Sequence, residues 1–187
     1  MTEGYPRAVL FGRALSRDYL RALMAGLPPA HKEAQNAERR MDTLAGKLAA
    51  ALAEAGYHSL GKQKTGRLPH KTVALRAGLG FIGKNNLLVT PQYGCALLLG
   101  KVLTDAPFAA LSQPPQPPAC GDCRACVEAC APGALLGTAW TLTTTREEIL
   151  TRKDCVLCLK CMLACPYTVR YAEELDPAAE EGRDDRD

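Results

Sequence analysis

The sequence predicts an α+β protein in which an α/β domain precedes a small cysteine-rich domain. Residues 33–55 repeat apolar side chains at the three- and four-residue spacing of an amphipathic helix. Short apolar segments bounded by glycine and proline indicate strands on either side of it. Eight of the nine cysteines lie after residue 119, which sets a second domain apart.

Two helices are expected in the first domain. Gly56 follows the longer one as a C-terminal cap, because glycine accepts the left-handed backbone in which many helices end. A shorter helix is expected at 71–77 and should stop at Gly78. The apolar face of the longer helix comprises Met41, Leu44, Ala45, Leu48 and Leu52.

Three segments of the first domain are predicted to be strands. The first is residues 7–12, and the other two are residues 86–90 and 95–104. A turn at 91–94, which begins with proline and ends with glycine, should join the last two. The first domain therefore mixes helix and strand.

The cysteines of the second domain form two runs with one spacing, C-x2-C-x2-C-x3-C. The first run is Cys120, Cys123, Cys126 and Cys130, and the second is Cys155, Cys158, Cys161 and Cys165. No basic-then-apolar export signal begins the chain, and disulfides are rare in the cytosol, so the cysteines indicate metal. The spacing is that of bacterial ferredoxins and predicts two [4Fe–4S] clusters.

In this pattern the fourth cysteine of each run binds the other run's cluster. We therefore assign one cluster to Cys120, Cys123, Cys126 and Cys165, and the other to Cys155, Cys158, Cys161 and Cys130. Zinc is the alternative, but its sites use paired C-x2-C hooks with four ligands at a time, and the third cysteine of each run is surplus to that arrangement. Between the runs, a capping box at 144–148 predicts a helix of about two turns.

The domain boundaries follow from proline and charge. Four of the seven residues 112–118 are proline, which favours an extended spacer. We predict an α/β cofactor or partner domain at 1–112, a linker at 113–118, a double-cluster domain at 119–172 and a disordered acidic tail at 173–187. Residues 171–187 carry a charge of −6 against +3 for the whole chain, so the rest is basic. No apolar run approaches the roughly 20 residues of a membrane span, and we expect a cytoplasmic protein.

A glycine segment at 78–84 matches both G-x-G-x-x-G and G-x4-G-K, two patterns that cradle phosphates. Both patterns need a preceding strand, whereas a helix is expected here, and Asn85 stands where a P-loop needs serine or threonine. Two interpretations remain open: a glycine-rich turn between helix and strand, or a turn whose backbone passes close to a bulky cofactor.

The same segment carries a family resemblance. Residues 70–94 include A-G-L-G-F-I-G-K-N, a strand and P-Q-Y-G, and residues 99–105 end in L-T-D. This order, followed by two ferredoxin runs, resembles the epoxyqueuosine reductase family, with Phe81 in place of its usual tryptophan. The resemblance covers residues 70–170 well and residues 5–60 only by layout.

The resemblance implies a corrinoid-dependent reductase, as in that family and in the related reductive dehalogenases. The fold would be a small nitroreductase-like α/β domain followed by a bacterial two-[4Fe–4S] ferredoxin-like domain. Cobalamin would lie between them, reduced by the nearer cluster, with Gly80, Gly83, Lys84 and Asn85 at its pocket. The family's acidic proton donor has no counterpart at 65–71. His70 could donate the proton instead, or it could simply pack locally.

Two functions are compatible with these patterns. One is a truncated relative that passes electrons to a bound corrinoid for a reductive reaction related to, but distinct from, epoxyqueuosine reduction on tRNA. The other is a non-enzymatic electron carrier that docks a partner oxidoreductase. Basic residues near the clusters would suit an acidic donor such as a ferredoxin or flavodoxin, or are simply a solvated surface. Cys95, outside both runs, is expected to be a small buried residue, with a ligand or redox role as the alternative.

Overall fold

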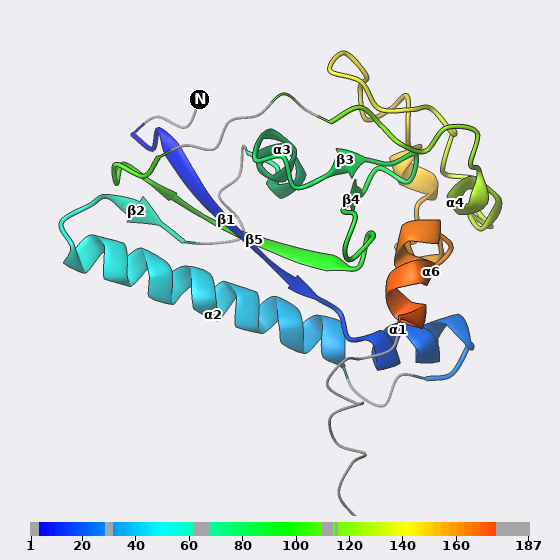
Figure 1. The fold of residues 1–187 in the computed structure, drawn as a ribbon, viewed down its shortest axis with the longest axis horizontal. Helices are drawn as coiled ribbons and strands as arrows, with labels where there is room; N and C mark the ends of the chain where they lie inside the picture. The colour runs from blue at the N-terminus through cyan, green and yellow to red at the C-terminus, as the bar shows by residue number, and fades with distance from the viewer. Residues whose placement is uncertain (1–3, 29–31, 62–67, 110–113, 115, 175–187) are drawn as a thin grey trace, which may run out of the picture.

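The computed structural model describes residues 4–28, 32–61, 68–109, 114 and 116–174. It is a mixture of helices and strands, as predicted (Figure 1). Two antiparallel sheets form the N-terminal part, and the C-terminal part is built of turns and short helices. Within the described ranges, no helix combines the length and the apolar character needed to span a bilayer.

The larger sheet has three strands in the order β1-β5-β2. β1 (Arg7–Ala14) pairs with β5 (Leu97–Thr104) along its whole length, with Arg7 opposite Thr104 and Ala14 opposite Leu97. β2 (Ser59–Leu60) adds a short edge on the other side of β5. The strands predicted from residues 7–12 and 95–104 are therefore confirmed, and the second of them is the centre of the sheet.

The long helix α2 (Glu33–Glu54) runs along one face of this sheet (Figure 1). Its residues Ala45 and Leu52 are buried against Val102 of β5, which is fully buried itself. The prediction that Leu44 lies on the buried face is wrong, because its side chain is 48% exposed. The buried face of α2 runs through Ala37 and Met41 and passes beside Leu44.

Both predicted helix-stop glycines adopt a left-handed backbone. Gly56 (φ 87°) donates to the Ala53 carbonyl and Tyr57 to that of Leu52, which is a Schellman cap. Helix α3 (His70–Arg76) ends in the same way at Gly78 (φ 73°). The predicted helix stops are therefore confirmed at both places.

The glycine segment leads from α3 into a two-stranded sheet of β3 (Phe81–Ile82) and β4 (Leu88–Val89). A Cβ on Gly80 would lie 2.1 Å from the carbonyl oxygen of Val89, so β4 can approach only a glycine at this position. The strand predicted at 86–90 shortens to β4, because Asn86 (φ 59°) turns the chain before it. The turn at 91–94 is confirmed, with Thr90 and Gly94 bonded to each other in both directions.

The cysteine-rich part contains α4 (Ala125–Glu128), the 3-10 turn η1 (Arg152–Asp154), α5 (Lys160–Leu163) and α6 (Pro166–Glu173). The two-turn helix predicted after the capping box is wrong. Glu148 does reach back to the backbone N–H of Thr145 (2.6 Å), but the chain then enters a bridge between Leu135 and Leu150. That pairing needs an extended backbone, which a helix would have prevented.

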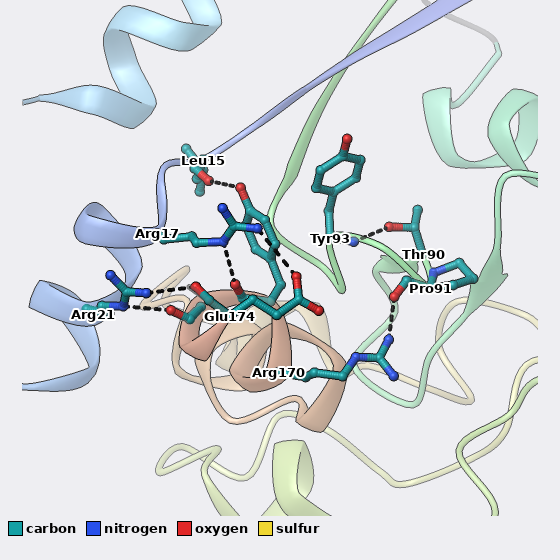
Figure 2. Close-up of polar contacts among 10 residues, drawn as sticks. Leu15, Arg17, Arg21, Thr90, Pro91, Tyr93, Arg170 and Glu174 are labelled. Carbon is teal, nitrogen blue, oxygen red and sulfur yellow. Dashed lines mark hydrogen bonds and ion pairs between the residues drawn. The ribbon is translucent and has the colours of Figure 1, made fainter. Parts of the chain in front are cut away.

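Helix α6 is held against α1 (Arg17–Met24) by two arginines (Figure 2). The Nε of Arg17 donates to the carbonyl of Tyr171 (3.0 Å), and the Nε of Arg21 donates to that of Ala172 (2.7 Å). Arg21 also reaches the carbonyl of Glu174. These carbonyls belong to the last turn of α6, where no intrahelical donor remains, so α1 caps the C-terminal helix.

The described residues include only part of the predicted linker and tail. Glu173 closes α6 and Glu174 is its C-cap, so the first two residues of the predicted tail belong to the helix end. The rest of the predicted tail, and residues 113 and 115 of the predicted linker, lie outside the described residues. Gln116, from the linker, donates to the carbonyl of Gly78.

The contact of Gly80 with β4 gives a first test. We expect Gly80→Ala to lower the free energy of unfolding by about 2 kcal/mol, because the new methyl group must push β4 away. Gly46 lies within α2 with open space around it, so Gly46→Ala should instead raise the free energy of unfolding by about 1 kcal/mol. Denaturant unfolding of both variants measures this. Equal effects of the two substitutions would contradict the close approach.

Candidate iron–sulfur site

The structure brings the eight cysteines of the two runs together in two sets. The charges that act on the Cys126 thiol are those of Cys120, Cys123, Cys165 and Cys161. Those that act on the Cys161 thiol are Cys130, Cys155 and Cys158. The influence of Cys161 on Cys126 runs between the sets; the grouping is otherwise the one that the spacing suggests, and the ligand assignment itself stays a prediction. None of the nine cysteines forms a disulfide.

Short local structures hold these cysteines in place. Cys126 and Cys161 lie in the single-turn helices α4 and α5, at equivalent places in the two runs. Cys165 precedes Pro166 as the N-cap of α6, and Cys155 ends the 3-10 turn η1. The loop of the first run is closed by a bond from the N–H of Cys123 to the carbonyl of Cys120 (2.9 Å).

Burial and crowding make two of these thiols, Cys126 and Cys161, poor anions by themselves. Burial, and then the neighbouring cysteines, raise the pKa of Cys126 to about 11 and also raise the pKa of Cys161. Several sulfurs that cannot all ionise side by side suit a cationic iron–sulfur core, which binds them as thiolates. No three His, Cys, Asp or Glu side chains of the described part could hold a single metal ion. In a cubane each thiolate binds its own iron, so the four sulfurs need not converge on one point.

The two sets differ in their exposure. In the first set, Cys126 and Cys165 are each only 8% exposed. In the second set no cysteine is buried, and Cys158 is exposed. Cys123 of the first set is exposed as well, so the sets differ in the two buried cysteines of the first and not in one being enclosed and the other open.

Cys165 joins the first set to the N-terminal part. It shares a buried core with Phe81, Val89 and Cys95. The backbone N–H of Cys95 donates to the hydroxyl of Thr168 (3.0 Å), a fully buried residue of α6. The Cys95 thiol donates to the Cys165 sulfur, which lowers the pKa of Cys165 to about 6 and raises the pKa of Cys95.

Lys84 and Asn85, predicted at a corrinoid pocket, contact the cysteine runs. The Nζ of Lys84 donates to the carbonyls of Gly121 (2.7 Å) and Cys123 (3.2 Å). The amide of Asn85, which is 5% exposed, donates to the Cys95 sulfur (3.2 Å) and the Cys161 carbonyl (3.3 Å). These two side chains therefore support the loops that carry the cysteines.

Gly80 and Gly83 pack against neighbouring segments of the same chain. A Cβ on Gly83 would lie 2.8 Å from the side-chain oxygen of Asn85 and 2.9 Å from Val89. The interpretation as a turn between helix and strand therefore accounts for both glycines. Their predicted role at a cofactor pocket stays a prediction.

His70 lies at the start of α3 in a group of basic residues. Its Nε2 is buried and has no hydrogen-bond partner among the described residues. Burial, and then Lys101, lower the pKa of His70, while Asp42 opposes them. Lys101 is 2% exposed and donates to the Leu68 carbonyl (2.6 Å). At neutral pH His70 is therefore mostly neutral, which weakens it as a proton donor; its catalytic role stays a prediction.

Lys71, beside His70, is also partly withdrawn from water. Its Nζ donates to the carbonyl of Asn86 (3.1 Å) and to the side-chain oxygen of the same residue. Burial, and then the charge of Arg146, lower the pKa of Lys71 to about 8. Together with His70 and Lys101 it makes this end of α3 strongly basic.

Sequence reasoning missed Thr168 and Lys101, and it missed the contact between Gly94 and Thr168. A Cβ on Gly94 would lie 2.3 Å from the backbone nitrogen of Thr168, so its turn and α6 touch directly. The P-Q-Y-G pattern marked Gly94 but not its partner 74 residues later. Lys101 lies in β5, whose other residues are mostly apolar. A lysine within an apolar strand was the sequence signal that could have identified it. A shallow groove of about 540 Å³ runs along α6 between Ala164 and Glu174 and begins at the two residues that flank Cys165.

Comparisons with known proteins agree with these features. Residues 119–169 match a family model described as a 4Fe-4S dicluster domain. The chain is 37% identical over 136 residues to an epoxyqueuosine reductase of Listeria monocytogenes, covering 62% of this chain and 35% of that protein. An epoxyqueuosine reductase of Lactococcus garvieae is 35% identical over 130 residues, with 62% and 36% covered. The chain thus spans about a third of the length of these relatives.

Solved structures extend the likeness to the fold. An epoxyqueuosine reductase crystallised with an epoxyqueuosine-modified tRNA-Tyr stem loop has a TM-score of 0.56 at 25% identity, covering 74% of this chain and 41% of that one. A reductive dehalogenase has a TM-score of 0.70 at 19% identity, covering 86% of this chain and 25% of that one, and this likeness concerns the fold alone. The resemblance to epoxyqueuosine reductases inferred from the glycine segment and the cysteine runs is therefore confirmed, and this is an iron–sulfur protein related to a family of oxidoreductases.

The buried His70 gives a pH prediction. Below pH 6.5 the unfolded chain protonates this side chain while the folded chain resists, so the unfolded state binds more protons. The stability contribution is present above pH 6.5 and is lost as the pH falls toward the folded pKa. We expect His70→Asn to lose less stability than the wild type between about pH 7.5 and 5.5 in denaturant titrations. The exposed His58 provides the control, since His58→Asn should keep the wild-type slope.

Proposed function

We propose that this relative of the epoxyqueuosine reductases is a redox protein that passes electrons through two [4Fe–4S] clusters to a corrinoid bound by its N-terminal domain. The observation that carries the proposal is the burial of Cys165 against Phe81 and Val89 of the glycine-segment hairpin. A cluster held by Cys165 would lie against that domain rather than at a free end of the molecule.

The residues present fit two clusters. Cys120, Cys123, Cys126 and Cys165 would hold the inner one, and Cys155, Cys158, Cys161 and Cys130 the outer one. Burial and neighbouring cysteines raise the pKa of Cys126 in the first set and of Cys161 in the second, and a cationic core would stabilise these two thiols as thiolates. Cys161 packs against the core cluster that contains Cys126, which brings the two sets close together, so that electrons could pass from the outer cluster to the inner one.

A corrinoid is the acceptor that the family resemblance implies. Reduced to its low-valent state, it would supply a strong nucleophile for the organic reduction. Support comes from the reductive dehalogenase of similar fold, whose structure suggests a B12-dependent mechanism. The buried Nε2 of His70 has no partner among the described residues and is a polar atom that a bound ligand would satisfy. His70 would orient or protonate the ligand, and Gly80 and Gly83 would stay beneath the pocket.

The domain division and the substrate belong to the same proposal. We keep the α/β domain at 1–112, which we take as nitroreductase-like, the linker at 113–118, the cluster domain at 119–172 and the tail at 173–187. The substrate would be an electrophilic organic compound reduced by two electrons, in a reaction related to that of the epoxyqueuosine reductases. A tRNA substrate is not expected, although one such relative was crystallised with a modified tRNA stem loop. The electron donor would be an acidic ferredoxin or flavodoxin.

A specific observation favours a second candidate, a carrier without a corrinoid. Lys84 and Asn85 direct their polar groups at the cysteine loops, so both residues have a role without any further cofactor. In this case the N-terminal domain would stabilise the clusters and dock a partner oxidoreductase.

Anaerobic reconstitution with iron and sulfide, followed by titration with cobalamin, separates the two candidates. We expect the corrinoid spectrum to shift on binding and to become low-valent when the clusters are reduced. His70→Asn should weaken the binding, with Leu142→Asn as a surface control. If the clusters form and reduce while cobalamin stays free, the carrier remains. If no cluster forms in folded protein, both fail.

Iron content tests the cluster assignment itself. The wild type should bind about eight iron atoms per chain, and Cys158→Ala should bind about four, because it removes a ligand of the outer cluster only. The electron paramagnetic resonance signal of the inner cluster should remain. Cys95→Ala is the matched control and should keep about eight. A Cys158→Ala protein with full iron content, or a Cys95→Ala protein with half, would contradict the assignment.

A further inference from the structure

The second cysteine loop holds two leucines in a backbone conformation that leucine disfavours. Leu157 has a φ of 54° and Leu159 a φ of 62°, both in the left-handed region. In this region the Cβ of an L-residue crowds the following carbonyl, which is why glycine or asparagine normally occupies it. Asn86 is the only other non-glycine residue of the described part with a positive φ.

The cysteine spacing does not require this backbone. Arg124 occupies in the first run the place that Leu159 has in the second, as the N-cap of the following one-turn helix. Yet Arg124 has a φ of −125°, and Asp122, the counterpart of Leu157, is also outside the positive region. The strain therefore belongs to the second loop and not to the motif.

The two side chains are also poorly buried in the folded chain. Leu157 is 81% exposed and Leu159 is 39% exposed, and Val156 beside them is 68% exposed. Strained leucines that bury little surface contribute little to the stability of this fold. Strain kept at such a place points to a function outside the fold. These three residues surround Cys158, which is itself exposed.

Charged residues border this apolar tip. Arg152, Lys153 and Lys160 are exposed, and Asp154 is the single acidic residue, so residues 152–160 carry a net charge of +2. The segment contains no aromatic side chain, and base stacking on single-stranded RNA would need one. An apolar centre with a basic border is instead complementary to an acidic protein surface.

We propose that residues 152–160 form the docking face for an acidic one-electron carrier protein of the ferredoxin or flavodoxin class. The inference rests on the proposed function, because it needs the outer cluster behind Cys158. On each encounter the carrier would be oxidised by one electron and the outer cluster reduced by one, so a two-electron reduction needs two encounters. Val156, Leu157 and Leu159 would exclude water from the contact, and the basic residues would steer the approach.

Leu157→Asn separates this role from a structural one. Asparagine tolerates the left-handed backbone, so the variant should unfold at the same or a higher denaturant concentration than the wild type. The rate constant for reduction of the clusters by an acidic [2Fe–2S] ferredoxin, measured by stopped flow, should fall about tenfold. The rate of reduction by dithionite should not change, since a small reductant needs no docking face.

Two further variants complete the test. Leu142→Asn changes a leucine that is 77% exposed outside this face, and it should leave both rates at the wild-type value. Lys153→Gln should weaken the decrease of the ferredoxin rate with rising salt. A Leu157→Asn protein that ferredoxin reduces at the wild-type rate would overturn the proposal.

The same variants also test two other possible occupants of this face, a second copy of the chain and an RNA. A wild-type dimer that Leu157→Asn dissociates, seen by sedimentation, would assign the face to a second copy and overturn the proposal. So would a loss of affinity for an RNA stem loop with an unchanged ferredoxin rate. Iron content and dithionite reduction are measured on every variant, so a failure to form clusters is distinguishable as a failure of the proposed function.

Discussion

The structure depends on the burial of the end of the second cysteine run within the core of the N-terminal part. Cys165 packs beside Phe81 and Val89, and Thr168 accepts a hydrogen bond from the backbone of Cys95. Arginines of α1 then satisfy the last carbonyls of α6. Buried polar groups need partners, and each of these is supplied from a segment more than 70 residues away. The end of the cysteine-rich part therefore shares a core with the N-terminal part.

This burial makes the two cysteine sets unequal. The set that includes Cys165 has two buried cysteines, although its Cys123 is exposed, whereas the set that includes Cys158 has none and lies beside exposed leucines. Exposure and hydrogen bonds to sulfur are among the factors that set the reduction potential of an iron–sulfur cluster. In the function proposed above, these unequal surroundings would be a physical basis for a directed electron path toward the N-terminal domain.

The glycine segment shows that a sequence pattern can predict the local backbone correctly without identifying what the residues contact. The sequence argued against a phosphate loop because a helix is expected before the glycines, and α3 confirms that context. It left open what the glycines are near. The structure places β4 against Gly80 and Asn85 against Gly83. The family resemblance suggested that Lys84 and Asn85 contact a cofactor, whereas their side chains donate hydrogen bonds to the cysteine loops. A local sequence pattern does not distinguish a polar group that binds a ligand from one that binds distant backbone.

The sequence by itself determined the local features. The periodicity of α2, the glycine stops at Gly56 and Gly78, the strands β1 and β5 and the grouping of the cysteines all follow from spacing over a few residues, because backbone geometry relates near neighbours directly. Only the tertiary structure decided that Leu44 is exposed, that Leu150 pairs with Leu135 instead of extending a helix, and that Gly94 touches Thr168. These outcomes depend on which distant surfaces compete for the same space, and that competition is settled by packing of the whole chain.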